Sequence, residues 1–308
     1  MSDRAPAGAV RGRWAPPSYL LLAAAALFWA SNLVIGRAVA GEIPPIALNF
    51  WRWVLALAIV LPFTAAELLR YRAVLVLHWR ILVLLGLTGI GSFQVCVYLA
   101  LQSTTALNAA LFMSAVPLVI PAVAFALDRE MLTWRQGAGL VLSLLGVVTI
   151  LSRADPEVLA GLRLNRGDLW VLAAVLLWSL YSVLLRRRPL ALPPTALLAA
   201  TMAVGIGLVL PLYLWELTAV GGFALETDNL LVLVYLAVFP AILAYIFWTR
   251  GVAQVGPSRA GPFMHLIPVF AALLAIVFLG EALERYHLVG VGVIGLGLLL
   301  ASRPGRGA

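Results

Sequence analysis

Apolar residues occur along this chain in runs of about 20, separated by short polar or arginine-containing segments. A helical run of that length matches the thickness of a bilayer core. Barrel strands would instead alternate apolar and polar residues in short segments, and the sequence lacks that alternation. The pattern predicts an all-α integral membrane protein whose ten transmembrane helices cover residues 18–39, 45–65, 80–100, 105–126, 134–151, 167–185, 194–215, 229–248, 256–279 and 285–301.

The second half of the chain repeats the order of the first. Pro-Pro at 44–45 returns at 193–194, an offset of 149 residues, and Phe-Met at 112–113 returns at 263–264, an offset of 151. With five spans in each repeat, the second copy enters the membrane from the opposite side. Inverted repeats of this kind build transporters whose binding site lies at the repeat interface. The predicted repeats are residues 1–155 and 156–308.

Composition agrees with a membrane protein, since 63% of residues are hydrophobic and 11% are charged. The net charge is +8 and every basic residue is arginine. Because arginines concentrate in cytoplasmic loops of membrane proteins, this basicity predicts topology and no binding of nucleic acid. Both termini should be cytoplasmic and the 152–166 loop external. The cytoplasmic set is Arg4, Arg11, Arg13, Arg70, Arg72, Arg80, Arg129, Arg135, Arg186, Arg187, Arg188, Arg250, Arg259, Arg303 and Arg306; the external set is Arg153, Arg163, Arg166 and Arg285.

The sequence lacks the motifs of common membrane enzymes. It has no P-loop, no cysteine–histidine metal set and no HExxH motif. Its three histidines are scattered, and Cys96, the one cysteine, lies inside an apolar span. We therefore expect no catalytic residues, metal or cofactor, and partners limited to a small-molecule substrate and the lipid bilayer.

Two further features bear on helix packing. Pro117 and Pro268 fall inside the fourth and ninth spans, where each should bend its helix. Small residues cluster in the last span of each repeat and allow close helix contact, either within one chain or between two copies. Monomer and homodimer both remain open on these residues. The small residues are Gly137, Gly139, Ser143, Gly146, Gly290, Gly292, Gly295 and Gly297.

Four segments carry a resemblance to a known family. They are Trp-Ala-Ser-Asn at 29–32, Phe-Trp-Arg-Trp at 50–53, Pro117, and Phe-Leu-Gly-Glu-Ala-Leu at 278–283. With the ten spans, they resemble the drug/metabolite transporter superfamily, specifically its EamA-type ten-span exporters, over nearly the whole chain. The first repeat departs slightly from the last pattern, with Asp-Arg-Glu-Met-Leu at 128–132. Within the superfamily the chain looks most like the YddG-type aromatic amino-acid exporters, although membership does not fix a substrate.

Candidate site residues are polar or aromatic side chains inside spans. Trp29 and Asn32 share one helix face, and their repeat partners Trp178 and Tyr181 share the equivalent face of the sixth span. Because lipid-facing positions are apolar, we expect these two faces to meet near the central axis and line a cavity. The alternative for the tryptophans is packing or interfacial anchoring.

Asn49 and Arg52 lie three residues apart on the second span. Arg52 lies about 10 Å inside the helix start at a rise of 1.5 Å per residue. A charge at that depth is unfavourable by roughly 3 kcal/mol and needs a partner, water or an anionic substrate group. Pairing with Glu42 or a helix end is the structural alternative, and Arg37 should snorkel to the interface.

Other candidates widen the expected wet, aromatic-lined cavity. Every Asp and Glu falls near a span end or outside the spans, so we expect transport without a proton gradient. A histidine inside the ninth span is the one titratable exception, and a structural hydrogen-bonding role is its alternative. The further candidate substrate-binding residues are Gln94, Tyr98, Asn108, Tyr245, Trp248 and His265.

These features predict a secondary transporter that moves amino acids or related metabolites by alternating access. Its export direction and bacterial inner-membrane location follow from the resemblance alone. Arg52 or amide groups would meet a carboxylate, and aromatic faces would meet an ammonium group. A multidrug or nucleotide-sugar carrier is the alternative within transport, and a channel or a membrane enzyme is the alternative outside it.

Overall fold

A computed structural model describes residues 18–39, 41–101, 103–104, 106–187, 192–279 and 282–302. These residues are almost entirely helical, and none of them forms a β-strand. Nine of the described helical segments are long and apolar enough to cross a membrane, and the shorter apolar helix Arg285–Ala301 supplies a tenth. The predicted all-α membrane fold with ten spans is therefore confirmed.

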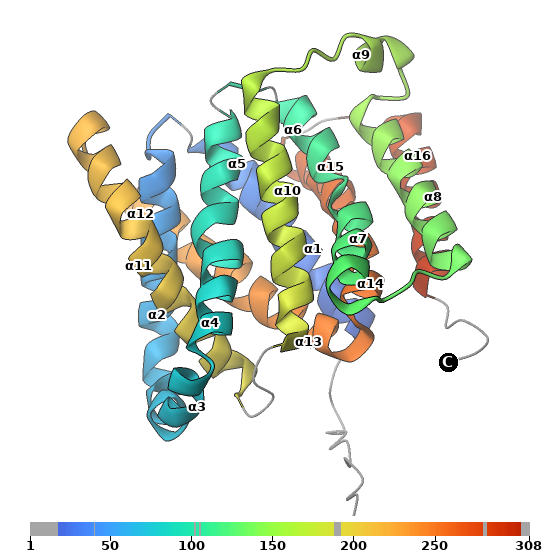
Figure 1. The fold of residues 1–308 in the computed structure, drawn as a ribbon. Coiled ribbons are helices and arrows are strands. Elements are labelled where there is room, and N and C mark those ends of the chain that lie inside the picture. Colours follow the sequence, from blue (N-terminus) through green and yellow to red (C-terminus); the bar gives the residue numbers. More distant parts are fainter. Residues whose placement is uncertain are drawn as a thin grey trace, which may run out of the picture.

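The helices of both repeats form one bundle (Figure 1). The first repeat contains α1 (Ser18–Ala38), α2 (Pro45–Arg70), α3 (Arg72–Leu77), α4 (Trp79–Leu85), η1 (Gly86–Ser92), α5 (Phe93–Leu101), α6 (Ala106–Met113), α7 (Val116–Asp128) and α8 (Trp134–Leu151). A short helix, α9 (Pro156–Ala160), joins the repeats. The second repeat contains α10 (Arg166–Leu184), η2 (Leu185–Arg187), α11 (Pro194–Val220), α12 (Thr227–Leu236), η3 (Ala237–Leu243), α13 (Ala244–Val255), α14 (Pro257–Ala260), η4 (Gly261–His265), α15 (Leu266–Leu279) and α16 (Arg285–Ser302).

The second and seventh spans begin alike and run further than expected. Pro45 and Pro194 occupy the first turns of α2 and α11, where a missing N–H breaks no helical hydrogen bond. The helices continue to Arg70 and Val220, about one turn beyond the predicted limits. A change from apolar to polar residues ends the buried span without ending the helix, so hydropathy underestimated both lengths.

Equivalent spans are irregular at equivalent positions. The third and eighth spans contain π-helical segments, η1 and η3, whose boundaries differ by the repeat offset of 151 residues. The fourth span breaks between α6 and α7, and the ninth passes through the 3₁₀ segment η4. Pro117 and Pro268 lie in the first turns after these interruptions. The predicted bends exist, and the prolines start the second half of each broken span.

The small residues of the last spans pack against each other within the chain. An added Cβ at Gly139 would lie 2.5 Å from the Gly297 carbonyl oxygen, and one at Gly146 would lie 2.7 Å from the Gly290 carbonyl oxygen. Backbone contact this close leaves no room for a side chain between α8 and α16. Intramolecular packing, one of the two alternatives, is therefore confirmed for these four glycines. Additions at Gly137, Gly292 and Gly295 would meet nothing within 4 Å.

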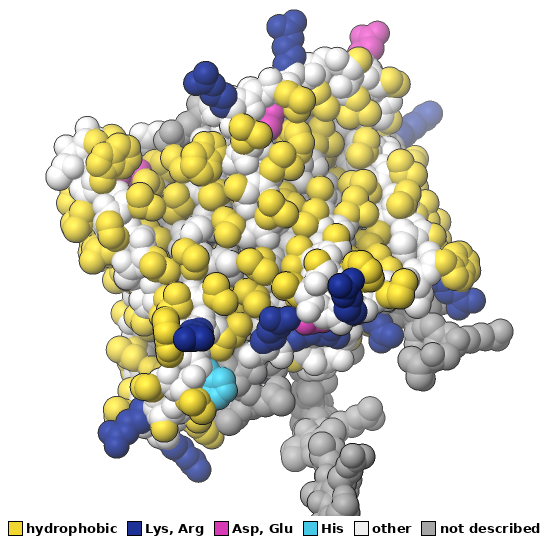
Figure 2. Space-filling model, in the orientation of Figure 1, with side chains coloured by type: hydrophobic (Ala, Val, Ile, Leu, Met, Phe, Trp, Pro, Cys, Tyr) yellow, Lys and Arg dark blue, Asp and Glu magenta, His cyan; other side chains and the backbone are white. Residues whose placement is uncertain are grey.

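Charge is unevenly distributed between the two ends of the bundle. Figure 2 shows arginine side chains gathered toward one end, with a largely hydrophobic surface between the ends, as a membrane-embedded surface requires. We call this the arginine-rich end, and α9 lies at the opposite end (Figure 1). The helix termini place at the arginine-rich end Arg70, Arg72, Arg80, Arg129, Arg135, Arg186, Arg187, Arg250 and Arg259.

Some predicted features lie outside the described part of the chain. They are the arginines at 4, 11, 13, 188, 303 and 306, and the Gly-Glu pair at 280–281. The backbone of Arg37 and Asn108 is described, whereas their side chains are not.

Candidate substrate-binding site

Aromatic side chains from both repeats meet in the middle of the bundle. Trp29 of α1 lies with its ring centroid 5.0 Å from that of Trp178 of α10, at an interplanar angle of 88°. Trp248 of α13 lies 5.5 Å from Trp29 and 6.0 Å from Trp178. Trp29 and Trp178 of the two repeat-related faces are therefore in direct contact, whereas the lining of a cavity by these faces stays a prediction. We call the following residues the aromatic cluster: Trp29, Trp53, Trp178, Tyr181, Tyr245 and Trp248.

Hydrogen bonds from the rings fix this cluster to the irregular spans. Trp29 donates from Nε1 to the Pro240 carbonyl oxygen in η3, at 3.2 Å. The Tyr245 hydroxyl donates to the Gly89 carbonyl oxygen in η1, at 2.6 Å. Gly89 also lacks a side chain where the Tyr181 ring lies, since an added Cβ would be 2.4 Å from that ring. π-Helical turns recur at functional sites, and here both present carbonyl groups to the cluster.

Arg52 forms a polar group beside the aromatic cluster. It is 3% exposed and donates to Asn49 Oδ1 at 2.9 Å and to Asn32 Oδ1 at 3.2 Å. Its guanidinium carbon lies 5.0 Å from the centroid of the Trp53 ring, a cation–π distance. Asn49 and Arg52 of α2 are therefore bonded to each other, and Asn32 of α1, which the sequence did not connect with them, joins the same group.

No acid balances the charge of Arg52 in the described part of the chain. Glu42, the structural alternative, is exposed and forms no ion pair with Arg52. Arg52 Nε and Asn49 Nδ2 are both buried without a hydrogen-bond acceptor. A buried cation with an unused donor is unfavourable unless an acceptor joins it. The arrangement therefore suits an anionic or strongly accepting ligand group.

Gln94 and Tyr98 of α5 form a second, smaller polar group. Their side chains interact with each other, and Tyr98 lies within electrostatic reach of Arg52. Tyr98 packs against a separate buried apolar group that contains Ile43, Leu48 and Leu236. The structure therefore places Gln94 beside Tyr98, and Tyr98 near Arg52.

His265 occupies a different place from the other candidates. Its Nε2 lies 3.0 Å from the Ser114 carbonyl oxygen at the break of the fourth span, and its Nδ1 lies 2.7 Å from Ser143 Oγ of α8. Both ring nitrogens therefore have partners, and the residue joins three helical elements. Ser114 is also its repeat counterpart, 151 residues earlier. The geometry agrees with the structural alternative for this histidine.

Two buried acids near span ends serve helix starts. Glu216 accepts from the backbone N–H groups of Ile46 and Ala47 at 3.0 and 2.6 Å, in the first turn of α2. Asp168 accepts from Thr104 Oγ1 and the Asn165 backbone N–H at 2.5 and 2.8 Å, at the start of α10. Such bonds satisfy amide groups that lack helical partners. Both acids therefore have structural partners away from the aromatic cluster.

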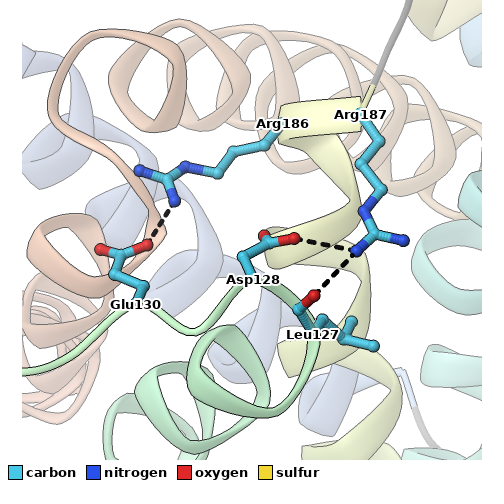
Figure 3. Close-up of polar contacts among 5 residues, drawn as sticks. All are labelled: Leu127, Asp128, Glu130, Arg186 and Arg187. Carbon is cyan, nitrogen blue, oxygen red and sulfur yellow. Dashed lines mark hydrogen bonds and ion pairs between the residues drawn. The ribbon is translucent and has the colours of Figure 1, made fainter.

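Ion pairs join the repeats at the arginine-rich end. Arg187 donates to Asp128 Oδ1 at 2.8 Å and to the Leu127 carbonyl oxygen at 3.2 Å, and Arg186 pairs with Glu130 (Figure 3). Asp128 ends α7, Glu130 follows it, and both arginines lie in η2 directly after α10, so these bonds hold the ends of the fourth and sixth spans together. Each pair is partly exposed and is therefore weak individually.

Sequence reasoning missed several residues that contact the site. Trp53 touches both Arg52 and Tyr245, while Met264 accepts from Trp178 Nε1 at 3.0 Å. The repeat provided a signal for Met264, since Phe-Met recurs at 112–113 and 263–264. The roles of the Gly89 and Pro240 carbonyls depend on helix geometry that their residue types do not encode.

Comparisons with known proteins agree with this architecture. The EamA-like transporter family matches residues 16–152 and again residues 165–303. A solved crystal structure, described simply as that of a protein, shares the fold with a TM-score of 0.75 at 21% identity, covering 94% of this chain and 99% of that one.

Curated relatives are similar over most of the chain. "Uncharacterized transporter YyaM" of Bacillus subtilis (strain 168) is 26% identical over 92% of this chain and 93% of its own length. "Probable terminal-alkyne amino-acid exporter" of Streptantibioticus cattleyicolor is 28% identical over 71% of this chain and 72% of its own length. "Probable amino-acid metabolite efflux pump" of Salmonella typhimurium is 26% identical over 56% and 58%.

Family, fold and apolar spans agree on one class of protein. The family matches both repeats, and the relatives carry the names of transporters, exporters and efflux pumps. The chain is thus a multi-pass membrane transporter with a small-molecule substrate, and not an enzyme. It belongs to the EamA-like transporter family of the drug/metabolite transporter superfamily.

Proposed function

We propose that this transporter exports amino acids with aromatic or other large apolar side chains, together with related metabolites, by alternating access. The observation that carries the proposal is the buried Arg52 beside the aromatic cluster, which has amide partners but no acid partner and an unused Nε–H. Arg52 and Asn49 bind the carboxylate, and the tryptophan and tyrosine rings receive the side chain and the ammonium group. The names of two relatives, an amino-acid exporter and an amino-acid metabolite efflux pump, support this substrate class and the outward direction.

The full site draws on both repeats. Arg52 and Asn49 provide carboxylate donors, and the aromatic cluster provides the apolar surface. Asn32, Gln94 and Tyr98 extend the polar side of this proposed site. The remaining proposed lining residues are Trp29, Asn108, Trp178, Tyr181, Tyr245, Trp248 and His265, of which His265 acts through the helix breaks that it joins.

Charge separates this proposal from the two rival carriers. Arg52 is the one buried arginine among the described side chains, whereas a nucleotide sugar brings several negative charges. A cationic drug would gain nothing from an unpaired guanidinium group and would be repelled by it. A single-carboxylate zwitterion fits the charge of the site best.

Orientation and location complete the proposal. We place the arginine-rich end in the cytoplasm of a bacterial inner membrane, with the repeats 1–155 and 156–308 in opposite orientations. Reporter fusions at the C-terminus and cysteine labelling in the 152–166 loop test this placement. Labelling of that loop from outside cells supports it, and an external C-terminus would overturn it.

Counterflow in reconstituted vesicles tests the substrate. Labelled phenylalanine should enter saturably and faster when unlabelled phenylalanine is inside, whereas phenethylamine, which lacks the carboxylate, should not compete. Arg52→Gln should lower kcat/KM by roughly tenfold or more, since truncating a buried charge partner typically costs 2–5 kcal/mol. The exposed Arg80 gives the control Arg80→Gln, which should transport normally. Equal transport of phenethylamine, or normal transport by folded Arg52→Gln, would contradict the proposal.

A further inference from the structure

The two repeat-related tryptophans at the centre donate to different kinds of acceptor. Trp29 Nε1 donates across the repeat interface to the Pro240 carbonyl oxygen of η3. Trp178 Nε1 donates within its own repeat to Met264 Sδ of η4, at 3.0 Å. Trp178 is 1% exposed, and Trp29 is half-buried. The same residue type therefore occupies two different states in the two repeats.

Each repeat nevertheless carries both acceptors. Gly89 in η1 is the counterpart of Pro240 in η3, and Met113 in α6 is the counterpart of Met264, each at an offset of 151 residues. The helix contacts are also equivalent, because α1 packs against η3 as α10 packs against η1. Each tryptophan thus has a methionine in its own repeat and a π-helical carbonyl in the other repeat.

We propose that the tryptophans exchange these acceptors during the transport cycle, an inference that rests on the proposed alternating access. In the state described, Trp29 holds the Pro240 carbonyl and Trp178 holds Met264. In the state open to the other side, Trp178 holds the Gly89 carbonyl and Trp29 holds Met113. Met113 and Met264 are therefore positioning residues for transport, each stabilising one of the two states.

The chemistry of the acceptors suits such an exchange. A thioether sulfur is a weak acceptor on a flexible, polarizable side chain, so it can hold a ring and release it. The Gly89 carbonyl already accepts from the Tyr245 hydroxyl, and a carbonyl oxygen has a second lone pair for Trp178. Each tryptophan N–H has an acceptor in both states, so neither state carries the free-energy penalty of an unpaired buried donor.

The ends of the bundle indicate which state is described. The two ion pairs between α7 and the end of α10 hold the arginine-rich end together (Figure 3). On the same face of α10, one turn beyond Trp178 toward that end, Ser182 is fully buried. On the face of α1 that bears Trp29, toward the opposite end, an added Cβ at Gly36 would meet nothing within 4 Å. The contact between Trp178 and Met264 therefore accompanies a closed arginine-rich end.

Paired conservative variants test the exchange. Cys96→Ala removes the one native cysteine, and Ser182→Cys or Gly36→Cys then reports access to either side of the cluster. A membrane-impermeant thiol reagent is applied to purified protein in lipid vesicles without substrate. Met264→Leu should raise labelling of Ser182→Cys and lower labelling of Gly36→Cys by several-fold. Met113→Leu should lower labelling of Ser182→Cys and raise labelling of Gly36→Cys. Combining Met113→Leu with Met264→Leu should return both labelling levels toward those of the parent protein.

Opposite shifts distinguish a positioning role from simple packing. The labelling ratio is that of Ser182→Cys to Gly36→Cys. The proposed exchange is wrong if both leucine variants leave this ratio unchanged while lowering thermal stability equally. It is also wrong if both variants shift the ratio in the same direction. The measurement uses no substrate, so it also separates this inference from the proposed function. Opposite shifts in a protein that does not transport phenylalanine would retain the exchange and reject the substrate.

Discussion

The two repeats differ most instructively at the two ends of the α2–α11 pair. Glu216 and Glu67 are repeat counterparts, 149 residues apart, and each lies beside the first turn of the other repeat's helix. Glu216 accepts two backbone N–H bonds from α2, whereas Glu67 accepts at 3.3 Å from the Thr195 hydroxyl of α11. A glutamate therefore lies at each end of the pair. Glu216 makes two hydrogen bonds to the start of α2, whereas Glu67 makes one longer bond to the start of α11.

The centre of the molecule shows a second kind of difference. The counterparts of Arg52 and Asn49 in the second repeat are Thr201 and Leu198, and Thr201 donates to carbonyls of its own helix. Some scaffold residues are repeated, but Arg52 and Asn49 are not. The repeated pairs are Trp29 and Trp178, Pro117 and Pro268, Gly139 and Gly290, Gly146 and Gly297, and Glu67 and Glu216. Repetition thus maintains scaffold residues in both halves, whereas the proposed carboxylate-binding residues occur in the first half alone.

The largest effect should come from the repeat-related tryptophans. Trp178→Ala should destabilise the protein by about 3–5 kcal/mol, because it empties a fully buried site. Trp29→Ala should destabilise it less, because Trp29 is half-buried. Thermal unfolding in detergent measures both losses. Equal losses would show that the two rings are packed alike in solution.

The next largest difference in stability should come from two glycines of α8, one that contacts α16 and one that does not. Gly146→Leu should destabilise the protein by roughly 1–3 kcal/mol or more, since its Cβ alone would lie 2.7 Å from the Gly290 carbonyl oxygen. Gly137→Leu on the same helix meets open space and is the matched control. Melting temperatures of the two variants provide the test. A stable Gly146→Leu protein would mean that the last spans separate readily.

Removing Glu216 should destabilise the protein more than removing Glu67, because Glu216 makes the shorter and more numerous hydrogen bonds. Glu216→Ala leaves two buried N–H groups without their acceptor and should destabilise folding by about 1–3 kcal/mol. Glu67→Ala loses a longer bond to a hydroxyl that water can replace, so its effect should be smaller. Unfolding by denaturant compares them. A larger loss in Glu67→Ala would place the tighter contact at the arginine-rich end.

The smallest expected effect concerns His265. Both of its ring nitrogens have partners, and the acids described near the spans lie at their ends. Collapsing a pH difference across vesicles, at fixed internal pH, should therefore leave the initial transport rate nearly unchanged. His265→Gln should change stability more than coupling. Substrate accumulation driven by a pH difference, and abolished by His265→Gln, would identify this histidine as the proton-binding group.

The sequence predicted the architecture because hydropathy and repetition are properties of residue order. Ten spans, two repeats and the contact of Trp29 with Trp178 follow from apolar runs and from matched residues at offsets of 149 and 151. The π-helical segments do not, because a change of hydrogen-bond register has no residue signature as strong as a proline. Trp53 was missed for a similar reason, since its contact with Tyr245 depends on how α2 packs against the eighth span.

Substrate binding to variants from each repeat tests most directly whether one site is shared between them. Calorimetric titration of purified protein with phenylalanine should give roughly tenfold weaker binding, or none, in both Arg52→Gln and Trp178→Leu, and unchanged binding in Arg80→Gln. Thermal unfolding confirms that each variant is folded. Loss of binding in both variants supports a single site at the repeat interface. Unchanged binding in either folded variant would contradict it.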